Sequence, residues 1–171
     1  MYNHAPPDYA CPFCRIVRGE PDERVHSTEA DVVCRAATVT ALVSSHQWPG
    51  NEPNIIVAPN EHFENIYELP ASYAGEIHAV AQKIALALKA VYDCEGVSTR
   101  QHNEPAGSQE VWRYHLHVTP RHLGDAFYSR IPQKQFMPAE ERAGHAARLR
   151  AHLLQAGRAS TSGDQDGLNA P

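Results

Sequence analysis

Residues 113–118, read as RYHLHV, alternate charged or imidazole side chains with apolar ones. Side chains alternate across a strand, so Arg113, His115 and His117 are expected to share one face while the residues between them face the core. A neutral imidazole attacks phosphorus and leaves again, a second one orients it, and an arginine binds phosphate through paired hydrogen bonds. The pattern indicates phosphoryl or nucleotidyl transfer. The alternative is two ordinary exposed histidines on a half-buried edge strand.

A glycine-containing loop precedes this segment at residues 103–109. Backbone N–H groups in such a loop bind phosphate oxygens, and glycine permits a close approach. We therefore expect a substrate-binding loop beside His115, formed by Asn103, Gly107, Ser108 and Gln109.

A CxxC motif, Cys11-Pro12-Phe13-Cys14, lies close to the start of the chain. This spacing indicates metal or redox chemistry rather than a structural disulfide. A thioredoxin-like role is disfavoured, because that motif opens a helix after a strand of a βαβ unit. The alternative is a pair of unligated thiols at a mobile N-terminus.

Short strands and two helices must position these residues. Apolar and β-branched runs predict strands at residues 24–27, 31–35, 39–44, 55–58, 97–101 and 111–120. An apolar face with helical spacing predicts a long helix that starts at a Ser72 cap and stops at Gly96. A second helix is expected from Pro138 to about Leu154. Because strands and helices do not alternate strictly, we predict an α+β fold: a mostly antiparallel sheet, the long helix packed on it, and a C-terminal helix.

The length of 171 residues fits a single domain, which we place at residues 1–156, with a flexible small and polar tail at residues 157–171. A hydrophobic content of 42% suffices for a core. The net charge of -5 argues against nucleic-acid and membrane-surface partners, which require a basic footprint. The sequence has no apolar run of bilayer length and no signal-peptide core, so a cytoplasmic protein is expected.

The segment from Gln109 to Arg121 resembles the signature of the histidine triad (HIT) family, which is a glutamine, a hydrophobe, and three histidines at alternate positions, often followed by Pro-Arg. Three other blocks agree in order and spacing. CPFCRI at residues 11–16 resembles the opening of many bacterial members, IIVAPNEH at residues 55–62 resembles the family's apolar strand with its Pro and His, and Asn103 matches a loop asparagine. The resemblance covers roughly residues 10–125.

The resemblance implies an α+β homodimer that binds a nucleotide or nucleotide conjugate against the triad strand. It also implies a nucleotide phosphohydrolase or nucleotidyl transferase that acts at the α-phosphate. His115 would be the nucleophile that forms a nucleotidyl-histidine intermediate, and His117 would be the third histidine of the triad. Asn103 and Gln109 would line the ribose and phosphate path.

The resemblance also implies a possible structural zinc site. In members with the CxxC motif, zinc is held at positions that correspond here to Cys11, Cys14, His62 and Arg113. A guanidinium does not bind zinc, so the ligand set is incomplete. Water or another histidine, with His102 as the candidate, would have to complete it.

The sequence departs from the family pattern at two positions. Arg113 stands in place of the first triad histidine, and Asn54 in place of a histidine ahead of the apolar strand. Arginine cannot shuttle a proton, although it binds phosphate and helps to keep His115 neutral. We therefore hypothesise activity that is reduced or restricted to good leaving groups. The alternatives are a nucleotide-binding protein with weak or lost catalysis, and a zinc-stabilised interaction protein with a vestigial pocket.

Overall fold

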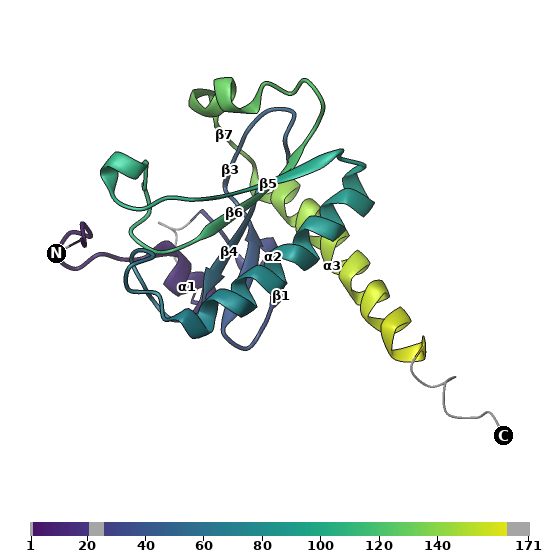
Figure 1. Cartoon of the computed structure of the whole chain (residues 1–171), viewed down its shortest axis with the longest axis horizontal. Helices are drawn as coiled ribbons and strands as arrows, with labels where there is room; N and C mark the ends of the chain where they lie inside the picture. The colour runs from purple at the N-terminus through teal and green to yellow at the C-terminus, as the bar shows by residue number, and fades with distance from the viewer. Residues whose placement is uncertain (1, 21–25, 164–171) are drawn as a thin grey trace.

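The computed structural model describes residues 2–20 and 26–163. Its centre is a five-stranded sheet in the order β1-β2-β4-β6-β5, in which every neighbouring pair is antiparallel (Figure 1). The strands are β1 (Val32–Arg35), β2 (Val39–Val43), β4 (Ile55–Pro59), β5 (Gly96–Gln101) and β6 (Leu116–Arg121). A second, two-stranded antiparallel sheet joins β3 (His46–Gln47) to β7 (Gln135–Phe136).

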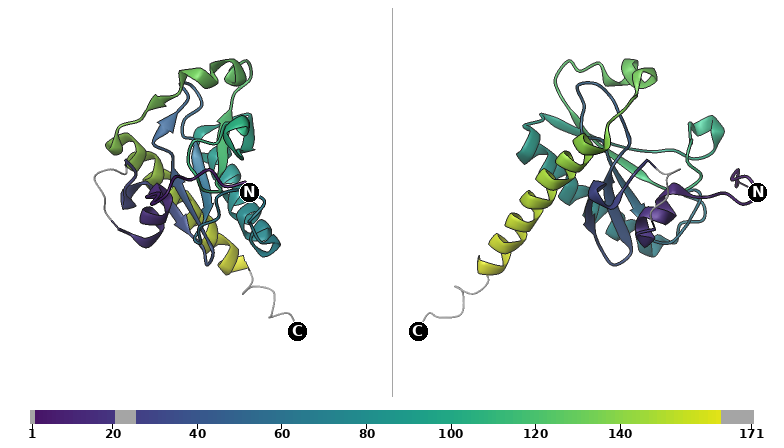
Figure 2. Two further views of the ribbon diagram at one scale, coloured as in Figure 1. Left: turned by 90° about the vertical axis from the view of Figure 1, so that its left-hand side faces the viewer. Right: turned by 180° about the vertical axis from the view of Figure 1, so that it is seen from behind.

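In the described part of the chain, three α-helices cover the two faces of the main sheet. The helices are α1 (Pro12–Arg18), α2 (Ala71–Tyr92) and α3 (Ala139–Gly163), and the short 3-10 turns are η1 (Glu29–Asp31), η2 (Pro105–Gly107) and η3 (Phe127–Gln133). Helices α2 and α3 pack together on one face, and α1 lies on the other (Figure 2). This architecture confirms the predicted α+β class. Within the described residues, no helix is both long and apolar enough to cross a membrane.

Strand β4 shows why the sheet is covered on both faces. All five of its residues are buried. Ile55 and Val57 belong to the large core beneath α2 and α3, whereas Ile56 and Ala58 belong to a smaller cluster with α1. This is the two-residue alternation of a strand, with an apolar side chain at every position.

The same alternation orients the histidine strand. Tyr114, Leu116 and Val118 join the core beneath α2, as predicted. His117 pairs with Ile56 of β4 and therefore lies on the α1 side of the sheet. The ring of His115 contacts Phe13 of α1, with their centroids 5.1 Å apart. The regular strand begins only at Leu116, however, so His115 precedes it rather than lying inside a strand from residue 111.

Both boundaries of helix α2 differ from the prediction. Helix α2 begins at Ala71 behind a Pro70 cap, rather than at a Ser72 cap. It ends at Tyr92 because Asp93 adopts a left-handed conformation with φ 51°, and Gly96 starts β5 instead of stopping the helix.

The C-terminal helix is longer than predicted. Helix α3 continues beyond Leu154 to Gly163 and so enters the segment assigned to a flexible tail; residues 164–171 lie outside the described part. The strand predicted at residues 24–27 falls partly outside the described residues, and His26 and Ser27 form no strand.

Candidate active site and thiol cluster

A cavity of about 640 Å³ opens on the α1 side of the sheet. His115 and His117 form part of its wall, with ring centroids 4.8 Å apart. Phe13 and Trp48 line it as well. Its volume lies in the range of small-molecule sites, about 300–1,000 Å³. The cavity is therefore the place where the predicted histidine chemistry has room for a substrate.

The backbone fixes the tautomer of His115. Its Nδ1 lies 2.7 Å from the carbonyl oxygen of Arg113. A carbonyl oxygen only accepts, so Nδ1 carries the proton and Nε2 of the neutral ring keeps its lone pair. Burial lowers the pKa of His115 to about 4, even though the hydrogen bond to Arg113 acts in the opposite direction. The ring is consequently a neutral base or nucleophile at neutral pH.

His117 is held in the opposite tautomer. Thr119 donates from Oγ1 to Asn54 Oδ1 at 2.9 Å, which turns Nδ2 of Asn54 toward His117 Nδ1 at 3.1 Å. The Nδ1 atom of His117 therefore accepts, and its proton sits on Nε2. Burial, together with the neighbouring His115 and Arg100, keeps the pKa of His117 well below its usual value. Asn54, one of the two departures from the family pattern, thus makes His117 a neutral hydrogen-bond donor.

Arg100 lines the same cavity as the two histidines and was not predicted from the sequence as a site residue. It is paired with His117 in the β5–β6 register and lines the cavity. Its guanidinium lies over the rings of Trp48 and Phe127, at 4.9 and 4.7 Å from their centroids. Its buried Nε has no hydrogen-bond partner among the described residues. The register that pairs it with His117 is set by the folded sheet and is not readable from the local sequence pattern.

The loop before β6 only partly lines the cavity. Ser108 and Gln109 border it. The amide of Gln109, however, is engaged within the protein: its oxygen accepts from the backbone N–H of Glu104 at 2.7 Å, and its nitrogen donates to the carbonyl of Glu64 at 2.6 Å. Gln109 therefore anchors the loop through its side chain.

Asn103 and Gly107 do not line the cavity, whereas His102 does. The side-chain oxygen of Asn103 accepts from the backbone N–H of Ile66 at 2.8 Å. The carbonyl of Gly107 lies 2.7 Å from Nδ1 of His102, whose ring centroid is 5.9 Å from that of His117. His102 thus lies beside the histidine pair, and the described structure does not group it with the CxxC cysteines as a metal ligand.

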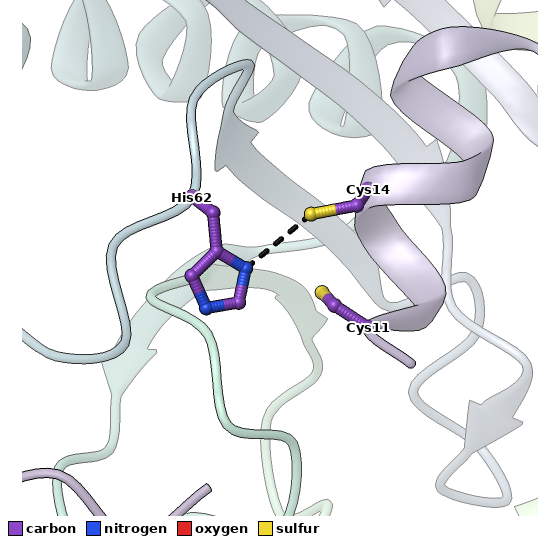
Figure 3. Close-up of side chains that lie close together, drawn as sticks. All are labelled: Cys11, Cys14 and His62. Carbon is purple, nitrogen blue, oxygen red and sulfur yellow. Dashed lines mark hydrogen bonds between the residues drawn. The ribbon is translucent and has the colours of Figure 1, made fainter. Parts of the chain in front are cut away.

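The thiols of the CxxC motif meet His62, as the resemblance implied (Figure 3). The three potential ligand atoms of Cys11, Cys14 and His62 lie within 4.8 Å of one another. Sγ of Cys14 is 3.3 Å from Nδ1 of His62. Burial raises the pKa of Cys11, but its contacts with His62 and Arg113 outweigh this effect and lower the pKa to about 6. These three side chains are compatible with zinc.

Arg113 lies in this thiol cluster and not in the cavity. Its side chain is 0% exposed, and Nη1 is 2.9 Å from Sγ of Cys14. The expectation that Arg113 binds a substrate phosphate does not match this position. It fills the place of the fourth zinc ligand without having a lone pair to offer. Among the described residues, the four-ligand set of a structural zinc site is therefore not present.

Comparison with known proteins shows the family to which this chain belongs. The HIT domain family matches residues 25–124, which is more than half of the chain. The chain therefore belongs to the HIT domain family, which confirms the resemblance seen in the sequence. It is 29% identical to Protein hit of Bacillus subtilis over 119 residues, which cover 68% of this chain and 75% of that protein.

Solved structures share the fold. A zinc-bound histidine triad family protein from Mycobacterium smegmatis superposes with a TM-score of 0.70 and 25% identity, covering 88% of this chain and 97% of that one. Diadenosine triphosphate hydrolase of Plasmodium falciparum, at 13% identity, gives a TM-score of 0.64 over 84% of this chain and 97% of its own; this likeness concerns the fold alone.

Proposed function

We propose that this protein is a nucleotide hydrolase or nucleotidyl transferase that acts at the α-phosphate of a nucleotide conjugate, with His115 as the nucleophile. The observation that carries the proposal is the 2.7 Å contact between His115 Nδ1 and the Arg113 carbonyl. It leaves the Nε2 lone pair for attack at the wall of the cavity. Membership of the HIT family supports the same assignment.

The reaction proceeds in two displacements. Nε2 of His115 bonds to phosphorus while the bond from phosphorus to the leaving group breaks, and that group departs with the electron pair. The ring then carries a positive charge, which the Arg113 carbonyl stabilises through Nδ1–H. In the second displacement, water or another acceptor bonds to phosphorus and releases its proton to the solvent. The phosphorus–nitrogen bond breaks, and its electron pair returns to Nε2.

His117 and Arg100 stabilise the negative charge that develops on the phosphoryl oxygens. His117 presents Nε2–H because Asn54 contacts its Nδ1. Arg100 provides a fixed positive charge on the neighbouring strand with an unpartnered Nε. Such preorganised donors stabilise a transition state more than a ground state. The apolar wall, which includes Phe13, Ile56 and Val111, suits the flat surface of a base.

The direct test is an activity assay on the full chain with an AMP ester, an AMP phosphoramidate and a dinucleoside polyphosphate. Release of AMP from any of them supports the proposal. Binding of AMP without turnover would instead favour the alternative of a nucleotide-binding protein with lost catalysis. Absence of both would contradict the proposed function.

Replacing Arg100 by methionine is expected to lower kcat/KM by about 10- to 100-fold, since a hydrogen bond to a charged group contributes about 1.5–3 kcal/mol. Methionine preserves most of the packing over Trp48 and Phe127 and removes the charge together with the N–H donors. Steady-state kinetics measure the effect, with Lys83→Met on the exposed side of α2 as a matched control. Equal kcat/KM values for the two variants would show that Arg100 takes no part in the reaction.

The pH profile of kcat/KM is expected to have an acidic limb near pH 4. Protonation of His115 removes the attacking lone pair, and burial lowers its pKa to about 4. Activity is therefore retained as the pH falls through the ordinary histidine range, about 6.5, and is lost only below it. Circular dichroism at each pH separates this loss from unfolding. A limb near the ordinary histidine value would show that the free enzyme's His115 is not desolvated.

We also propose that the chain forms a homodimer, on the basis of its family. Light scattering of the purified protein gives the mass directly. A mass equal to that of one chain at micromolar concentration would refute this part of the proposal.

A further inference from the structure

The cluster of Cys11, Cys14, His62 and Arg113 joins three segments that are distant in sequence. The two cysteines lie at the start of α1 and within it, His62 follows β4, and Arg113 precedes β6 (Figure 3 shows the two thiols and the imidazole). A metal ion would ordinarily hold such a set of thiols and imidazole together. Here the fourth member is a cation of the chain itself.

The contacts of the Arg113 guanidinium are all inside the protein. Nη1 donates to Sγ of Cys14 at 2.9 Å and lies 3.8 Å from Sγ of Cys11. Nη2 donates to the carbonyls of Pro59, Asn60 and Glu61, the last two at 3.2 and 3.3 Å. Among the described residues, no carboxylate forms an ion pair with this buried cation. The sulfur atoms are consequently the nearest groups able to carry the countercharge that a buried cation requires.

A zinc ion does not fit beside this guanidinium. Zinc bonds sulfur at about 2.3 Å, so an ion on Cys14 would lie within about 5 Å of Nη1, which is 2.9 Å from the same sulfur. Two cations at that separation in a buried site repel each other. The guanidinium also has no lone pair with which to coordinate the ion.

We infer that Arg113 provides the positive charge that a bound metal would otherwise bring to the Cys11–Cys14–His62 cluster, so that the chain closes this site without zinc. The guanidinium links α1 to the end of β4 and the β4–α2 connection, through the thiols and three backbone carbonyls. The backbone carbonyl of Arg113 accepts from His115, so these contacts also fix the segment that orients the His115 ring. This metal-free linkage is independent of the proposed reaction.

The experiment compares the zinc content of the wild-type chain and Arg113→His. Both are purified in zinc-supplemented buffer, desalted, and measured by elemental analysis and by thermal unfolding with and without chelator. The wild type is expected to hold almost no zinc and to unfold at the same temperature with chelator. Arg113→His, which offers a fourth ligand, is expected to hold about one zinc per chain and to lose stability with chelator. The double variant Cys14→Ser/Arg113→His should lose that zinc.

Each other outcome overturns the inference. Stoichiometric zinc in the wild type would show that the guanidinium does not replace the metal. A folded Arg113→His variant without zinc would show that the arginine was not what excluded the ion. If Arg113→His unfolds, refolding with zinc should restore it, and failure to do so contradicts the equivalence of metal and guanidinium.

Discussion

Replacing His115 by alanine is expected to reduce turnover of a nucleotide substrate by on the order of 10⁴-fold or more, because removal of a covalent nucleophile eliminates the two-step route. The Nε2 atom of His115 keeps its lone pair, because the Arg113 carbonyl accepts the hydrogen bond from Nδ1. Neither His117, which is a donor, nor Arg100 offers a comparable nucleophile. Steady-state kinetics with an AMP phosphoramidate measure the loss.

Two comparisons make this result interpretable. His78→Ala removes an exposed histidine of α2, whose Nδ1 contacts the carbonyl oxygen of Ala74 in the same helix, and should leave kinetics unchanged. The melting temperature of His115→Ala shows whether the chain remains folded, and retained AMP binding shows that the cavity remains formed. Turnover within tenfold of the wild type would exclude His115 as the nucleophile, since a factor of ten is only about 1.4 kcal/mol.

The second large effect concerns stability. Asp31→Asn is expected to destabilise the protein by about 3–5 kcal/mol, because it leaves Arg142 as an uncompensated buried charge. Asp31 and Arg142 are both 0% exposed, and Arg142 Nε lies 3.2 Å from Asp31 Oδ2. This pair fastens α3 to η1 beside the sheet. Thermal or denaturant unfolding measures the loss, expected to be on the order of 10 °C in melting temperature.

An exposed ion pair provides the matched control. Glu29 meets Arg35 at 2.6 Å, but their side chains are 67% and 35% exposed. Glu29→Gln should therefore cost less than about 1 kcal/mol. Equal losses from the buried and the exposed substitutions would show that the Asp31–Arg142 pair is solvated in solution.

The local pattern of the sequence predicted the main sheet well because its central strands are simple. The run 55–58 is apolar at every position and is buried on both faces. The alternation of residues 114–118 correctly separated the core side chains from the histidines. Periodicity alone sufficed there, since each strand residue has two possible faces and burial decides between them.

The fate of Arg113 was not predictable in the same way. It reaches the α1 side of the sheet like His115, but it lies beyond the end of the regular strand, where its partners are Cys14 and a set of backbone carbonyls. Which charge is buried beside which sulfur depends on long-range packing. The position of Arg113 among the thiols removes the predicted phosphate contact. The hypothesis of activity restricted to good leaving groups rested on arginine's inability to shuttle a proton, and it stays a prediction.

The hydrogen-bond partners of the amide side chains were not predictable for a related reason. Asn103 and Gln109 carry groups that suit a phosphate site, yet both satisfy backbone atoms of the protein. Asn54, by contrast, was treated as a loss and instead contacts His117 Nδ1. An amide offers both a donor and an acceptor, so its role depends on which neighbour needs pairing.

Trapping the covalent intermediate tests most directly whether His115 attacks the phosphorus. The full chain is mixed with a nucleotide conjugate radiolabelled at the α-phosphorus, quenched in alkali within one turnover, digested and mapped by mass spectrometry. We predict a single nucleotidyl group on the peptide that carries His115, and none in His115→Ala. Turnover in the wild type without any labelled peptide, or with the label on another residue, would contradict the central claim that His115 attacks the phosphorus.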